Sequence, residues 1–276
     1  MSLALLMDAE SCGAILSVAG RRVKSDVTGT KGTRMTSEDY LKNVRADGDR
    51  VLALLGRDAE RRPPTCPEWT MRDLAAHLAV VYLHKTACTR LLAEPSPWPP
   101  AAPEQGIDTW LRDAREEMLE VFRAAGPSAP SRTWHEPDQT VGFWMLHMAV
   151  ETAIHRVDAE LAFGPVTPID EELAVAAISE TLDIMLAGDW SDEPQPGPAG
   201  TVLLTTPEHS WRVRMAPELV EIEHEAVPDE GDEGVVAGSA SEVLLWLWRR
   251  IGTDEIATRG DDKAVVRLRD WMAIIT

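Results

Sequence analysis

The spacing of apolar residues predicts that the first two thirds of the chain are helical. Apolar side chains recur at intervals of three and four residues, as they do on one face of an α-helix. The predicted helices begin near Ser37 and then cover about 71–93, 106–125, 140–162 and 169–187. Segments rich in proline or glycine separate them, and Glu94–Pro103 alone holds five prolines. That segment is therefore expected to be a loop.

Polar residues at the predicted helix starts fit the roles of N-caps. Ser37 precedes Glu38 and Asp39 and is expected to cap the first helix. Thr70 stands three residues before Asp73, which resembles a capping box at the start of the second helix.

The pattern changes to a period of two after the proline-rich segment 189–198, which is expected to be a linker. Alternation of apolar and polar residues predicts half-exposed antiparallel strands. The predicted strands lie at about 201–205, 211–215, 219–223 and 234–237. Two helices follow, at about 243–251 with Ser239 as its cap and at about 261–274. The sequence thus predicts an extension over 1–34, a helical domain over 35–188 and a smaller α+β domain over 199–276.

Composition narrows the classes of partner. Apolar residues make up 44% of the chain and charged residues 26%, as in globular proteins. The 27 Lys and Arg against 46 Asp and Glu give a net charge of -19, which repels nucleic acid and anionic membranes. No stretch is long and apolar enough for a membrane span. Three cysteines without a CxxC pair favour a reducing, cytoplasmic location.

Candidate metal ligands lie on the fourth predicted helix. Glu151 and His155 are four residues apart, so their side chains leave the same helix face. His147 continues this stripe, but residues eight apart lie about 12 Å apart along a helix axis, so all three cannot share one ion. A third ligand is expected from the second helix, where His77 and His84 share a face. Spacing alone does not choose between them.

Residues near this pair have competing interpretations. Asp158 is a better candidate than Glu160 for a hydrogen-bond partner of the His155 ring, the alternative being an exposed helix end. Cys66 has no visible partner base and is not expected to be reactive. Four tryptophans in apolar helical positions are expected in the core rather than in a ligand cage; they are Trp69, Trp144, Trp246 and Trp248.

Three segments resemble the mycothiol-dependent maleylpyruvate isomerase family of actinobacteria. They are Cys66–Leu78 (CPEWTMRDLAAHL), Glu151–Glu160 (ETAIHRVDAE) and Val236–Arg250 (VAGSASEVLLWLWRR), the last followed by Gly260-Asp261. The resemblance covers residues from about 36 to the end of the chain. It implies an N-terminal DinB-like antiparallel four-helix bundle and a C-terminal α+β domain.

The resemblance also implies site residues and cofactors. The family's metal ligands fall on His77, Glu151 and His155, which selects His77 over His84. The implied ion is divalent and usually zinc, although nitrogen and oxygen ligands also suit nickel or iron. Mycothiol, a low-molecular-weight thiol, is the implied cosubstrate. Arg250 is the nearest match to an arginine implicated in catalysis, and Arg249 stands beside it.

The leading functional hypothesis is a metal-dependent enzyme that transfers mycothiol to a small electrophile or isomerises a substrate through a thiol adduct. The alternative is a non-catalytic, metal-bearing module that binds a small ligand or a regulatory partner. Either is expected to be a monomer or a homodimer. Residues 1–34 have no counterpart in the family pattern, so the protein is hypothesised to carry an unusual extension or to start near Met35.

Overall fold

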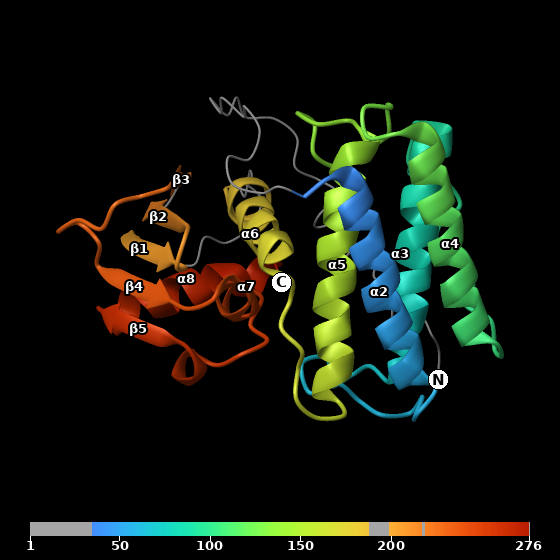
Figure 1. Cartoon of the computed structure of the whole chain (residues 1–276), viewed down its shortest axis with the longest axis horizontal. Helices are drawn as coiled ribbons and strands as arrows, with labels where there is room; N and C mark the ends of the chain where they lie inside the picture. The colour runs from blue at the N-terminus through green and yellow to red at the C-terminus, as the bar shows by residue number, and fades with distance from the viewer. Residues whose placement is uncertain (1–34, 188–198, 217–218, 276) are drawn as a thin grey trace. The chain divides into compact units, whose positions relative to one another are not determined.

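The computed structural model describes residues 35–187, 199–216 and 219–275. Contacts between residues divide the chain into two compact units, which over the described residues cover Met35–Thr167 and the part from Pro168 onward. The first unit is helical, and the second combines helices with a five-stranded sheet (Figure 1). The predicted fold class, a helical domain followed by a smaller α+β domain, is confirmed. The expectations for residues 1–34 and for the linker 189–198 lie outside the described residues.

Four helices build the first unit and pack side by side (Figure 1). They are α2 (Ser37–Leu55), α3 (Met71–Leu91), α4 (Ile107–Ala125) and α5 (Val141–Leu161). Helix α2 packs mainly on α5, and α3 packs mainly on α4. Aromatic side chains at the centre, among them Trp144, Tyr82 and Phe122, are almost fully buried. Helix α5 is buried over most of its circumference, so its polar residues must find partners inside the unit.

Capping boxes fix the beginnings of α2 and α3. At α3, Thr70 accepts a hydrogen bond from the Asp73 amide, and Asp73 accepts one from the Thr70 amide, as predicted. At α2 the prediction was wrong by one residue: Thr36 caps the helix and pairs with Asp39, while Ser37 is the first helical residue. Thr36 and Ser37 are both suitable N-cap residues by type, but only Thr36 has an acidic residue, Asp39, three positions later.

Helix α6 (Glu171–Glu180) belongs to the second unit, together with the π-helical turn η2 (Thr181–Leu186) that continues it. The sequence had placed this segment in the helical domain, with the domain ending at 188. The contacts instead divide the chain between Thr167 and Pro168. The apolar face of α6 packs on α7 (Ala240–Leu247), and sequence patterns do not show which neighbour covers an apolar face.

The sheet of the second unit has the strand order β3-β2-β1-β4-β5. Its strands are β1 (Gly200–Thr205), β2 (Ser210–Ala216), β3 (Leu219–His224), β4 (Gly234–Ala237) and β5 (Ala257–Gly260). The expectation of a wholly antiparallel sheet was wrong, because β4 pairs with β1 in parallel. Strand β5 was not predicted, since its four residues lack an apolar alternation. Helix α8 (Asp262–Ile275) packs on β1 and β4, and the short 3-10 turn η3 (Thr253–Glu255) precedes β5.

The segment that joins β3 to β4 is held over the sheet by one buried arginine. Arg212 of β2 is 3% exposed, and its guanidinium donates to Asp232 at 2.6 Å and to Glu223 at 2.9 Å. It also contacts Asp229 at 3.1 Å and the carbonyl of Val227. Asp229 and Asp232 lie in the acidic run 229–233. This connection is therefore organised by ion pairs around Arg212.

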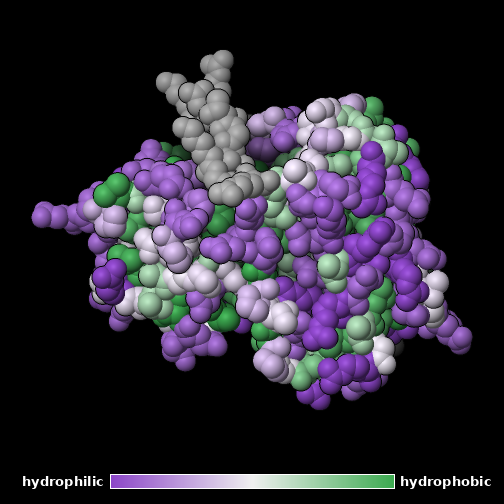
Figure 2. Space-filling view, in the orientation of Figure 1, coloured by the Kyte–Doolittle hydropathy of each residue, from purple (hydrophilic) through white to green (hydrophobic). Residues whose placement is uncertain are grey.

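Within the described residues, no helix is long and apolar enough to cross a membrane. The face in Figure 2 is largely hydrophilic, with small, separate hydrophobic patches. This surface agrees with the excess of acidic over basic residues.

Arg212→Ala is expected to destabilise the C-terminal unit by about 2–3 kcal/mol, because the buried Asp232 carboxylate would lose its charged partner. Denaturant unfolding of the full chain, combined with hydrogen exchange of the β2 amides, measures this loss. Arg214→Ala is the matched control, since Arg214 is half-exposed and contacts the same Glu223 at 2.6 Å. Equal effects of the two substitutions would contradict a special role of Arg212.

The C-terminal unit is also expected to lose stability in acid through Asp232. The hydrogen bond from Arg212 lowers the pKa of Asp232 in the folded chain. The resulting stabilisation is present above the ordinary aspartate pKa of about 3.9 and is lost as the pH falls through the lower, folded value. Asp232→Asn should therefore reduce stability at neutral pH and flatten its dependence on pH below about 4. An unchanged acid dependence in urea titrations would refute this assignment.

Candidate metal centre

Helix α3 presents His77 toward α5. The capping box of Thr70 and Asp73 sets the start of α3, and His77 follows it by two turns on the inner side of the helix. The ring of Trp69, just before the cap, lies 4.9 Å from the His77 ring and 6.1 Å from the His155 ring, between centroids. Local capping and the Trp69 ring thus restrict the positions open to His77.

Helix α5 supplies Glu151 and His155 on one face. Glu151 Oε1 lies 3.1 Å from His77 Nε2 and 3.3 Å from His155 Nε2. The rings of His77 and His155 meet edge to face, with centroids 4.9 Å apart. One donor atom from each of the three residues lies within 4.8 Å of the other two. The structure therefore brings together the three residues that the family pattern selected.

A second carboxylate holds the outer side of the His155 ring. Asp158 Oδ2 lies 3.0 Å from His155 Nδ1, and Asp158 Oδ1 accepts a hydrogen bond of 2.6 Å from Thr65 Oγ1. Asp158 is fully buried. Of the two acidic residues considered from the sequence, Asp158 contacts the histidine, while Glu160 pairs with Arg50 and Arg156. With Nδ1 held by Asp158, the Nε2 atom of His155 faces Glu151.

The charges of this cluster are tightly coupled. Burial opposes ionisation of Glu151, but the neighbouring histidines hold its pKa well below the ordinary value. Burial also disfavours a charged His155, yet Glu151 and Asp158 raise the pKa of His155 to about 9. For His77, burial prevails and lowers the pKa. In the protein alone, His155 is therefore the ring that carries the proton and His77 the neutral one.

The donor set fits a divalent cation. Two imidazoles and one carboxylate are common zinc ligands, and they leave a fourth position open in a tetrahedral site. When both rings are neutral, Glu151 and Asp158 together carry two negative charges, which one divalent ion balances. The Asp158 contact matches the carboxylate partner that metal-bound histidines usually have. The side chains of His77 and Glu151 are 24% and 16% exposed, so the cluster is reachable from solvent on the side of His77.

Other residues from the sequence analysis lie elsewhere. His147 is buried among Trp134, Phe143 and Trp144 and does not join the cluster. His84 joins a different group with Cys88 and Glu94. Cys66 is partly exposed and belongs to neither group.

Arg250 belongs to the second unit, where it follows the end of α7. Its Nη1 atom donates to the Trp248 carbonyl at 2.7 Å, and its guanidinium lies 5.8 Å from the centroid of the Trp248 ring. Arg249 is exposed and has a positive φ of 61°. The two arginines thus differ: Arg250 is held against the protein, and Arg249 points to solvent.

Trp69 was assigned to the core from its sequence pattern, and this was wrong. Trp144, Trp246 and Trp248 are indeed buried, but Trp69 is partly exposed and covers the two candidate histidine ligands. Its position directly before an N-cap is the signal that could have separated it from the core tryptophans. A residue before the cap lies outside the helix and does not share its buried face.

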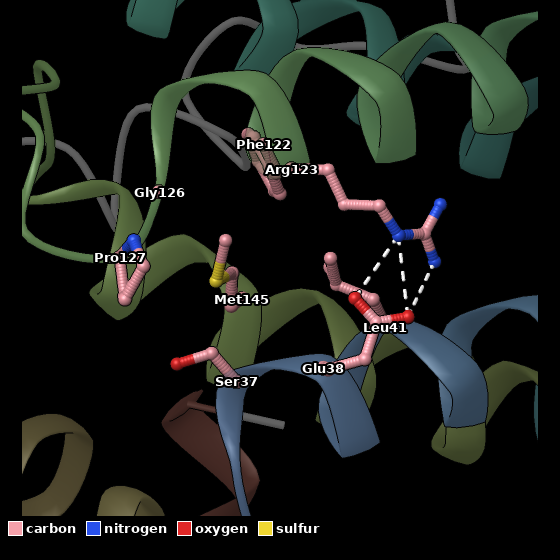
Figure 3. A pocket seen from close by; sticks show the side chains of 8 residues that line it. All are labelled: Ser37, Glu38, Leu41, Phe122, Arg123, Gly126, Pro127 and Met145. Atoms are coloured by element: carbon pink, nitrogen blue, oxygen red, sulfur yellow. Dashed lines mark hydrogen bonds and ion pairs between the residues drawn. The ribbon is translucent and has the colours of Figure 1, made fainter.

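Two surface hollows of the first unit lie away from this cluster. One, of about 180 Å³, is lined by residues of α2, the C-terminal end of α4 and Met145 of α5 (Figure 3). The ion pair between Arg123 and Glu38, at 2.9 Å, borders it. None of the three candidate ligands lines this hollow.

The fold is that of a DinB-like helical domain followed by a small α+β domain, and two solved structures share it. One is a mycothiol-dependent maleylpyruvate isomerase, with a TM-score of 0.52 and 16% identity. The other is a histidine-to-alanine mutant of a mycothiol-dependent maleylpyruvate isomerase, with a TM-score of 0.51 and 14% identity. Each match covers 81% of this chain and 93% of the other. No curated protein sequence matches the chain significantly.

The sequence comparison identifies the type of the N-terminal domain. Residues 41–160 match the family model described as the mycothiol maleylpyruvate isomerase N-terminal domain. This range contains all three candidate ligands and most of α2 through α5. Residues 41–160 therefore form a domain of the mycothiol maleylpyruvate isomerase N-terminal type.

Proposed function

We propose that the protein is a divalent-metal enzyme that uses mycothiol, either to isomerise a small unsaturated acid or to transfer the thiol to another small electrophile. The observation that carries this proposal is the cluster of His77, Glu151 and His155, which offers three donor atoms around one point and is open on one side. The match of residues 41–160 to the family model and the shared fold favour mycothiol as the thiol and a maleylpyruvate-like acid as one substrate class.

In this proposal, the side chains from α3 and α5 hold a zinc-class ion. The bound ion would act as a Lewis acid that lowers the pKa of a thiol at the open position. Asp158 keeps the His155 ring oriented through Nδ1, and Thr65 fixes Asp158 in turn. Trp69 shields one side of both rings and restricts the entry of water and ligands. These residues bind and orient, and none of them needs to exchange a proton with the substrate.

Arg250 is proposed to act on the substrate rather than on the metal. A fixed guanidinium suits a carboxylate because it can donate two parallel hydrogen bonds. The contact with the Trp248 carbonyl holds Arg250 more firmly than its neighbour Arg249, which supports Arg250 as the functional member of the pair. An acid substrate is the class that such a group would recognise.

His155→Ala is expected to lower the zinc content of the full-length protein by one equivalent, because the two remaining ligands cannot hold the ion tightly. Asp158→Asn should keep the ligand set but weaken zinc affinity about 10-fold to 100-fold. Metal analysis after dialysis against buffered zinc measures both effects. His147→Gln is the control on the same stripe of α5 and should not change the zinc content. Equal zinc content in His155→Ala and the unaltered protein would exclude the site.

The zinc-loaded protein is expected to consume mycothiol and a small electrophile, or to isomerise maleylpyruvate when mycothiol is supplied. His77→Ala should reduce the rate at least about 100-fold, as loss of a metal ligand removes the charge stabilisation of a thiolate. Arg250→Lys should raise KM for an acid substrate more than Arg249→Lys does. Full zinc occupancy with no turnover of any tested electrophile would favour a non-catalytic binding module.

A further inference from the structure

A second group of potential ligands lies near the C-terminal end of α3 and contains a thiol. His84 and Cys88 are one helical turn apart on α3 and are 5% and 0% exposed. Glu94, from the loop that follows α3, turns back to them. One donor atom from each of these three residues lies within 4.8 Å of the other two. Neither the family pattern nor the proposed reaction accounts for this arrangement.

The distances within this group are close to those expected around a single ion. With bonds of about 2.0 Å to nitrogen or oxygen and about 2.3 Å to sulfur, tetrahedral ligand atoms lie about 3.3–3.5 Å apart. In the protein, His84 Nε2 lies 3.1 Å from Glu94 Oε2. Cys88 Sγ lies 3.9 Å from Glu94 Oε2, 4.0 Å from His84 Nε2 and 3.5 Å from His84 Nδ1. A turn of the His84 and Cys88 side chains that brings the sulfur about 0.5 Å closer to Nε2 and to Glu94 would give ligand spacing.

The surroundings provide both burial and access. Burial, with a smaller effect of Lys85, lowers the pKa of His84 to about 3, so its ring is neutral at physiological pH. Burial also raises the pKa of the Cys88 thiol to about 12, so in the protein alone the sulfur is protonated. Glu94 is 39% exposed and forms the outer edge of the group, where Arg132 contacts it at 3.3 Å. An ion can therefore arrive from the side of Glu94.

From this geometry, we propose that His84 Nε2, Cys88 Sγ and a Glu94 carboxylate oxygen form a second metal site, which takes a thiolate-binding divalent ion of the zinc class. Thiolate and imidazole ligands select such ions over magnesium or calcium. Binding forms the metal–sulfur bond and releases the thiol proton to solvent, so affinity increases with pH. A ligand set of nitrogen, sulfur and oxygen distinguishes this site from the sulfur-free cluster around Glu151.

Two cations, Lys85 and Arg132, oppose an ion at this site, and Lys85 is the one that contacts the His84 ring. Its ammonium lies 3.3 Å from His84 Nδ1 and 4.5 Å from the centroid of the Trp144 ring. When Nε2 binds an ion, Nδ1 carries the proton, so the ammonium must leave Nδ1. The Trp144 ring offers it a second, favourable contact. Replacing Lys85 with methionine removes this competition, and the Lys85→Met protein should bind the ion more tightly than the unaltered chain.

Cobalt titration of the metal-stripped full-length protein tests the proposal. Sulfur bonded to Co²⁺ produces an intense near-ultraviolet charge-transfer band, and nitrogen and oxygen ligands do not. The unaltered chain is expected to show this band, and Cys88→Ser should abolish it. Cys66→Ser is the matched control and should retain the band. Absence of the band in the unaltered chain, or its persistence in Cys88→Ser, would overturn the site.

Two further variants remove the remaining ambiguity. Because Cys88 is fully buried, circular dichroism must show that Cys88→Ser is folded; if it is not, Glu94→Gln decides. Glu94→Gln changes a partly exposed side chain and should weaken the cobalt affinity, measured from the intensity of this band, about tenfold or more. Unchanged affinity would refute the site. His155→Ala should keep the band, so failure of the cluster around Glu151 and failure of this second site give different results.

Discussion

The carboxylate of Glu151, enclosed between two histidine rings, is the interaction on which the candidate centre depends. A buried carboxylate is costly unless charged or hydrogen-bonding partners surround it. Here one partner comes from α3 and the other from the next turn of α5, so the charge requires the two helices to keep a fixed register. His155 in turn requires Asp158, whose charge requires Thr65. Each polar group of this chain is stabilised by the next, and the arrangement leaves the Nε2 atoms of both rings facing one carboxylate.

The remaining buried charges of α5 tie the same helix to α2. Arg156 is 3% exposed and pairs with Glu160 at 2.9 Å and with Asp47 of α2 at 3.2 Å. Glu160 also accepts from Arg50 of α2 and from the amide of Thr167. Buried ion pairs of this kind add little net stability, but removal of one partner is costly. They therefore fix the positions of the helices more than they stabilise the fold. The ion pairs of Arg156 and Glu160, which follow the ligand His155 on the same helix, thus help to fix the position of α5 and of its ligands.

Features that depend on residues close together in the sequence could be predicted, whereas features that depend on tertiary contacts could not. Helix periods and the caps at Thr70 and Ser239 depend on neighbours three or four residues apart, which the sequence displays directly. The parallel pairing of β4 with β1 depends on where the segment after β3 crosses the sheet, and Arg212 holds that segment through tertiary contacts. Likewise, spacing placed Glu151 and His155 on one face but did not choose between His77 and His84. That choice depends on which turn of α3 lies opposite Glu151 on α5.

The structure shows why both histidines of α3 are placed as they are. They are two turns apart and face the same interior, yet their surroundings differ in chemistry. His77 meets Glu151 and His155, which are oxygen and nitrogen donors, whereas His84 meets Cys88 and Glu94, with Lys85 beside it. A cation near His77 is balanced by two carboxylates, while one near His84 needs a thiolate to form, because Lys85 and Arg132 already offset Glu94. An ion at the first group must displace the proton of His155, whereas an ion at the second must displace the proton of the Cys88 thiol, a cost that the metal–sulfur bond has to offset.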